Sequence, residues 1–119
     1  MADNIKYPGP GVSLNVAVPV GTVSGDPVEI VDMHGVALTD RDSNGYATVK
    51  FGFMYVADLA VEAVNHTVGS AVAIGDKLYY DSAATIKINK DSTDGKAIGY
   101  ALEAIVSGSS DTIMVGMID

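Results

Sequence analysis

The segment from Asp40 to Gly45 has the residue types of a calcium-binding loop. Side-chain oxygens recur at the alternate positions 40, 42 and 44, and Gly45 could make the sharp turn that such a loop needs. The twelfth position, where a bidentate glutamate normally completes the coordination shell, is Phe51. Asp and Asn side chains also bond to their own backbone in tight turns. We therefore predict that this segment is the polar tip of a β-hairpin, and we predict no metal site.

Few other side chains suit metal binding or catalysis. His34 and His66 are the only histidines, and neither has a second ligand at the i+2 or i+4 spacing of a strand or helix. We expect both in turns or at the surface. The chain has no cysteine, which excludes thiolate nucleophiles and Cys-ligated zinc.

Acid–base catalysis would need two carboxylates that converge. The candidates are Asp26, Asp58, Glu62, Asp76 and Glu103. Nothing in their spacing brings two of them together, and in the expected strands they alternate outward toward solvent. Neither the Gly-x-x-x-x-Gly-Lys-Ser/Thr loop nor a Gly-x-Gly-x-x-Gly turn is present, so no phosphate-binding loop is expected. We predict no enzymatic activity and no cofactor.

The composition limits the partners of the protein. Of 119 residues, 15 are acidic and 7 are basic, and the net charge of −8 repels a phosphate backbone. Residues 7–25 are uncharged, but three prolines and four glycines within them argue against a membrane-spanning helix. We predict no targeting segment. The chain is 48% hydrophobic and only 18% charged, which favours apolar surface left over for oligomerisation.

Apolar residues at every second position predict an all-β fold, because a period of two places them on one face of a strand. The pattern occurs in residues 12–20, in Val49, Phe51 and Phe53, and in Leu59, Val61 and Ala63. Breaks of Gly, Asp, Asn or Ser every eight to twelve residues indicate short antiparallel strands. Asn44-Gly45 supplies the positive φ of a tight connection.

Further strands are expected along the rest of the chain. Val28–Ile30 and Val36–Leu38 predict one hairpin, and Asp76–Asp81 with Ala84–Asn89 predicts a second. Residues 97–106 predict a strand with Tyr100, Leu102, Ala104 and Val106 on one face, and a short helix over 99–106 is the competing interpretation. The last strand, 112–118, is apolar on both faces, which indicates core on one side and a neighbour on the other.

The first eleven residues show no such period. Tyr7-Pro8-Gly9-Pro10-Gly11 favours an extended course, because proline cannot donate to a ladder. We therefore divide the chain into an extended N-terminal arm, residues 1–11, and a single β domain, residues 12–119.

Three stretches resemble the small bacteriophage head-decoration, or capsid cement, proteins. They are Gly35–Asp40, Gly75–Asp81 and Gly95–Ala104, and a short hydrophobic last strand follows them. The resemblance runs from about Gly11 to the C-terminus. It implies a small antiparallel β-barrel or β-tulip-like domain that binds the outside of the expanded capsid. It implies a homotrimer at three-fold or quasi-three-fold positions, with the major capsid protein as partner and no catalytic residues.

On this basis the predicted function is that of a structural cement protein of the virion, made in the host cytoplasm, which stabilises the shell by clamping capsomers. The expected contacts come from the arm and the last strand. The candidate contact residues are Tyr7, Pro8, Pro10, Val12, Met114, Met117 and Ile118. Two alternatives stay open: a β-rich adhesion module of a phage or cell surface, and a small β-barrel enzyme that uses Asp58 and Glu62.

Overall fold

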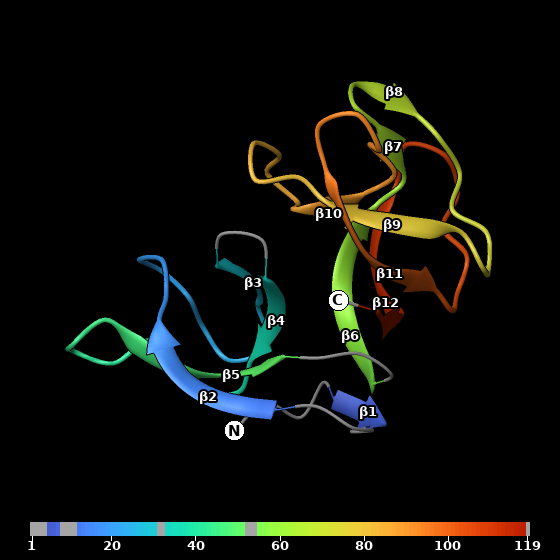
Figure 1. Cartoon of the computed structure of the whole chain (residues 1–119). Helices are drawn as coiled ribbons and strands as arrows, with labels where there is room; N and C mark the ends of the chain where they lie inside the picture. Colours follow the sequence, from blue (N-terminus) through green and yellow to red (C-terminus); the bar gives the residue numbers. More distant parts are fainter. Residues whose placement is uncertain (1–4, 8–11, 31–32, 52–54, 119) are drawn as a thin grey trace.

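A closed barrel and a curved four-stranded sheet form most of the protein (Figure 1). The computed structural model describes residues 5–7, 12–30, 33–51 and 55–118. The described residues contain no helix, which confirms the all-β prediction. No helix that could cross a membrane occurs in this part of the chain.

Five strands close the barrel. They are β6 (Tyr55–Glu62), β10 (Ile88–Asn89), β9 (Lys77–Tyr80), β11 (Lys96–Ala101) and β12 (Ser110–Met117). The longest pairing joins β6 to β12, antiparallel over eight residue pairs. The barrel closes where Ile88 of β10 pairs in parallel with Val61 of β6. Closure leaves β6 without an open edge over this part of its length.

The barrel interior follows the period of two that predicted these strands. Along β6, residues 55, 57, 59 and 61 are buried, and residues between them are exposed or half-buried. In β12, Ile113, Val115 and Met117 point into the same core. Asp58 and Glu62 lie on the outer face of β6, as expected.

The four-stranded sheet has the order β2 (Val12–Ala17), β5 (Tyr46–Phe51), β4 (Met33–Ala37), β3 (Pro27–Ile30). Its own apolar cluster consists of Val18, Val28, Ala37, Ala47, Val49 and Phe51. The predicted hairpin of β3 and β4 is confirmed. The first strand is shorter than predicted, since β2 ends at Ala17 and Val20 is 85% exposed in the following loop. Leu14, on the edge strand β2, is also exposed.

Part of the predicted arm joins the barrel. Residues Ile5–Tyr7 form β1, which pairs antiparallel with β6 at Ala57 and Val56. The arm was expected to lie ahead of the domain, but these three residues extend its sheet. Residues 1–4 and 8–11 lie outside the described residues.

The sheet and the barrel meet through aromatic side chains. His34 was expected in a turn or at the surface, and this prediction is wrong: it lies within β4 and is only 2% exposed. Its ring lies 5.3 Å from that of Tyr80 in β9, and its Nε2 is 2.9 Å from Oε2 of Glu29. The buried Tyr55 hydroxyl donates to the carbonyl oxygen of Lys50 in β5. Burial raises the pKa of Tyr55, so the hydroxyl stays a donor at neutral pH.

The strand predicted over 97–106 is too long. β11 ends at Ala101, and the helix considered for 99–106 does not form. The pairing of β11 with β9 is irregular between Ala97 and Gly99, and this irregularity changes which side chains of β11 face the core. Within β11 Ile98 and Ala101 are buried, and beyond the strand Ile105 is buried where it pairs with Val72. Tyr100, Leu102 and Val106, which were expected to share a face, are all exposed.

A glycine in β11 is needed for this barrel to close. A Cβ at Gly99 would collide with the carbonyl oxygen of Gly116 and lie 3.1 Å from Val115 Cγ1. A Cβ at Gly116 would meet only the Leu102 side chain, at ordinary contact distances of 3.7 to 3.9 Å. Gly99→Ala is therefore expected to lower the free energy of unfolding by about 3 kcal/mol. The matched Gly116→Ala is expected to change it by less than about 1 kcal/mol. Urea denaturation measures both, and equal effects would contradict the assignment.

Candidate functional site

The Asp40–Gly45 segment is a hairpin tip whose side chains hold its own backbone. Oδ1 of Asp42 accepts from the amides of Asn44 and Tyr46, each at 2.9 Å. Oδ1 of Asp40 accepts from the amide of Ser24 at 2.8 Å, and Gly45 has a φ of +87°. These contacts support the interpretation as a turn, because the oxygens that a cation would need already bind amides.

The candidate acid–base carboxylates are used in local structure. Asp26 accepts from the amide of Val23, and Glu103 accepts from the amide of Met114 in β12. Asp76 accepts from the amide of Ala73, and this hydrogen bond, followed by the one from Lys90, holds its pKa below the usual range. Each of these three carboxylates therefore stabilises the local backbone of a loop or a strand.

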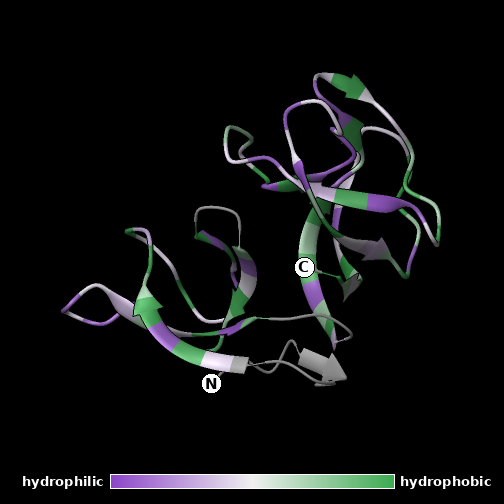
Figure 2. Ribbon diagram, in the orientation of Figure 1, coloured by the Kyte–Doolittle hydropathy of each residue, from purple (hydrophilic) through white to green (hydrophobic). Residues whose placement is uncertain are grey.

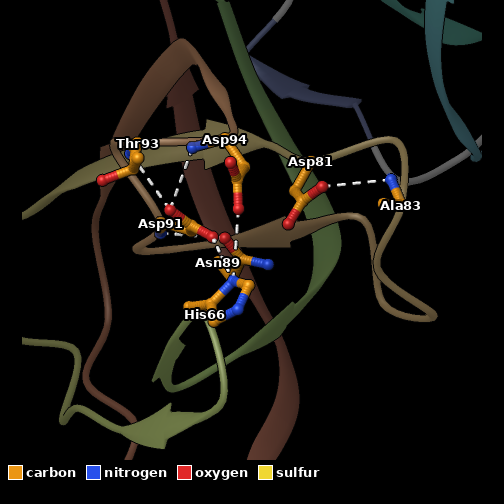
Figure 3. Close-up of polar contacts among 7 residues, drawn as sticks. All are labelled: His66, Asp81, Ala83, Asn89, Asp91, Thr93 and Asp94. Carbon is orange, nitrogen blue, oxygen red and sulfur yellow. Dashed lines mark hydrogen bonds and ion pairs between the residues drawn. The ribbon is translucent and has the colours of Figure 1, made fainter.

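One cluster was missed at the sequence level. The side chain of Asp91 is 1% exposed, and its Oδ2 lies 3.3 Å from Nδ1 of His66 (Figure 3). Oδ2 of Asp94 lies 3.2 Å from the same nitrogen. His66 occupies the turn between β7 (Val64–Asn65) and β8 (Val68–Gly69), with a φ of 62°. Its placement in a turn was predicted, but a partner 25 residues away gives no local sequence signal.

The cluster also organises the turn that precedes β11. Oδ1 of Asp91 accepts from the amides of Thr93 and Asp94, at 3.0 and 3.1 Å. The backbone hydrogen bond from Asp94 is the main cause of a lowered pKa at Asp91, with the amide of Thr93 and the His66 ring contributing. One histidine nitrogen and two carboxylates within 4.8 Å are ligand types that a divalent cation accepts. Here they pair with one another and connect the β7–β8 turn to the 90–95 turn.

The lowered pKa of Asp91 makes a pH-dependent contribution to stability. An unfolded Asp titrates near ~3.9, so the contribution is complete above that pH and disappears as the pH falls through the lower folded pKa. Asp91→Asn is expected to unfold at a lower temperature than the parent protein at pH 7, and this difference is expected to shrink below about pH 4. Asp94→Asn, with a side chain 54% exposed, is the control and is expected to change little. Thermal unfolding at both pH values measures this, and a pH-independent difference would contradict it.

The outer face of β12 presents apolar residues, as predicted for the last strand. Met114 is half-buried there, and its carbonyl oxygen accepts from the amide of Leu102. Tyr100, Leu102 and Ile118 are 40%, 36% and 39% exposed around it. We call these four residues the β12 wall.

The other candidate contact residues are placed differently. Met117 is 2% exposed and belongs to the barrel core. Tyr7 and Val12 lie in β1 and β2, and their side chains are outside the description. Pro8 and Pro10 lie outside the described residues.

A groove between the four-stranded sheet and the barrel was not foreseen. Its volume is about 360 Å³, and loop residues 19–22, the start of β3 and residues 85–87 line it. Ala60 and Tyr80 form its barrel side, and Asp26 and Lys87 are its charged residues. Asp58 and Glu62 are not among the lining residues, so this groove does not unite the carboxylates of the enzyme alternative.

Comparison with known proteins gave one match. The model of the family described as phage cement protein matches residues 8–117. No curated protein and no solved structure matches the chain.

Proposed function

Because this chain belongs to the phage cement protein family, a structural family of the phage capsid, we propose that it binds the outside of the expanded head and clamps neighbouring capsomers. The family match over residues 8–117 is the observation that carries the proposal. The closed barrel supports it, since a clamp must hold its contact surfaces in fixed positions. The major capsid protein is the proposed partner.

The proposed assembly is a homotrimer at three-fold or quasi-three-fold positions. A trimer that makes three modest contacts binds with an affinity roughly 10²–10⁴-fold higher than that of a single subunit. Binding to the expanded lattice and not to its separated parts then stabilises the shell by mass action. The arm and the β12 wall are the proposed contact surfaces, because both contain apolar residues and the two charges of the arm, Asp3 and Lys6, cancel.

Cosedimentation tests the proposal. Purified protein is mixed with expanded cognate capsids that lack it and, separately, with unexpanded proheads, and bound copies are counted per capsid. The expected result is saturable binding to expanded heads alone, at a multiple of three copies per site. Absence of binding to both particles would reject the cement role and favour an adhesion module.

A further inference from the structure

One end of the barrel carries exposed aliphatic residues, and the two charged side chains that contact it, Lys90 and Asp76, pair with each other. Residues 67–75 and 104–110 contain no Asp, Glu, Lys or Arg, in a chain with a net charge of −8. Within them Val68, Ile74 and Val106 are 67%, 70% and 72% exposed. We call these two segments the barrel end; Figure 2 shows the hydrophobic colouring of β8 and of the segment that follows it.

The two segments form one surface. Val72 and Ile105 exchange two backbone hydrogen bonds of 2.9 Å each, and both of their side chains are buried. A Cβ at Gly69 would lie 2.6 Å from Oγ of Ser107, so β8 also packs closely against the second segment. Val68, Ile74 and Val106 therefore lie on two segments that backbone hydrogen bonds and close packing hold together.

The groove has complementary properties. It is concave, mainly apolar, and its volume of about 360 Å³ is in the range of pockets that accept small apolar groups. Val20, Pro27, Val28 and Ile86 supply apolar lining, and the single acid Asp26 is balanced by Lys87. In Figure 1 the loop before β10 lies at the left of the barrel, toward the four-stranded sheet, and β8 lies at the top, so the groove and β8 are separate parts of the surface.

We propose that the barrel end of one copy of this chain inserts its exposed aliphatic side chains into the groove of a second copy. Charge favours this pairing: most contacts between two chains of −8 would bring acidic groups together, whereas these two surfaces add no net charge. Shape also favours a contact between barrel end and groove over a contact between two barrel ends. The exposed aliphatic side chains of the barrel end can enter a concave groove, whereas two barrel ends would both present protruding side chains. A contact between two different surfaces is head-to-tail, and such contacts form a ring when the rotation between neighbouring copies closes. The proposed trimer is such a ring.

This inference rests on the proposed function, for which it supplies the contact between subunits of the trimer. The arm and the β12 wall then remain available for the shell. Val20, at the rim of the groove, and Val106, at the barrel end, are the test positions, since both are more than 70% exposed and can be changed without opening a core.

Native mass spectrometry over a range of protein concentrations tests the contact. Val106→Asp is expected to raise the dissociation constant of the trimer at least about tenfold, because an unpaired carboxylate enters an apolar groove. The double variant Val106→Asp with Val20→Lys is expected to recover much of the loss, since the new charges meet across each contact. Tyr46→Asp, an equally acidic change at an exposed apolar position of β5, is the control and is expected to leave the trimer intact.

The inference is overturned if Val106→Asp forms trimers as the parent protein does, or if the parent protein is monomeric at all concentrations. A Val106→Asp trimer that no longer binds expanded heads would overturn it too, and would assign the barrel end to the capsid protein. The proposed function fails by a separate measurement, cosedimentation of the unmodified protein with expanded heads.

Discussion

Deletion of residues 1–11 is expected to lower the affinity for expanded heads by roughly a thousandfold. If each arm contributes a factor of about ten, the contributions of three subunits multiply when one trimer engages its site. Cosedimentation at graded protein concentrations measures the change. The same deletion is expected to weaken trimer formation if the arm also contacts a neighbouring subunit.

The deletion needs a control for folding, because it removes β1 and its pairing with Ala57 and Val56 of β6. Truncation of residues 1–4 keeps Ile5–Tyr7 and separates the loss of β1 from the loss of the preceding residues. Circular dichroism establishes whether each variant retains the β fold. A folded 1–11 deletion with unchanged head binding and unchanged trimer formation would falsify the role proposed for the arm.

Leu78→Ala is expected to lower the free energy of unfolding by about 2–5 kcal/mol, which is a large share of the stability of a domain of this size. Leu78 is fully buried in β9, where it pairs with Gly99 of β11, and its removal leaves a cavity inside the closed barrel. The surrounding strands are held by pairing on both sides, so they can collapse only partly into the space.

Leu14→Ala is the matched control, since Leu14 is 47% exposed on the edge strand β2. It is expected to cost less than about 1 kcal/mol. Urea denaturation of the two variants compares them directly. The core assignment is wrong if Leu78→Ala unfolds at the same urea concentration as the parent protein.

The sequence identified most of the strands, and it predicted the buried face correctly for β6 and β12 but not for β2, where Leu14 is exposed. Leu59, Val61, Ile113 and Val115 were assigned to apolar faces, and all four are buried. The alternation failed after Gly99, because an irregular pairing turns the following residues by one position. The family resemblance was also accessible, because the stretches that carry it are local turn and strand patterns, and the family match over residues 8–117 confirms it.

The contacts between residues that are distant in the chain could not be predicted from the sequence. His34 looked like a turn residue, and its burial depends on Tyr80, which comes from another sheet. His66 has its carboxylate partners 25 and 28 residues later, at positions 91 and 94, and the turn before β11 brings them together. A single sequence carries no signal for such contacts, since they depend on which strands become neighbours.

Local chemistry was enough to specify the all-β class, the hairpin of β3 and β4, the turn at Gly45 and the acidic charge of the surface, because each depends on residues close together in the chain. Barrel closure, the groove and the uncharged barrel end arise from strand order. The parallel contact of Ile88 with Val61 joins residues 27 positions apart, and no alternation of apolar residues encodes that choice of neighbour. Packing of the whole chain selects it, because this arrangement covers the apolar faces of all five barrel strands at once.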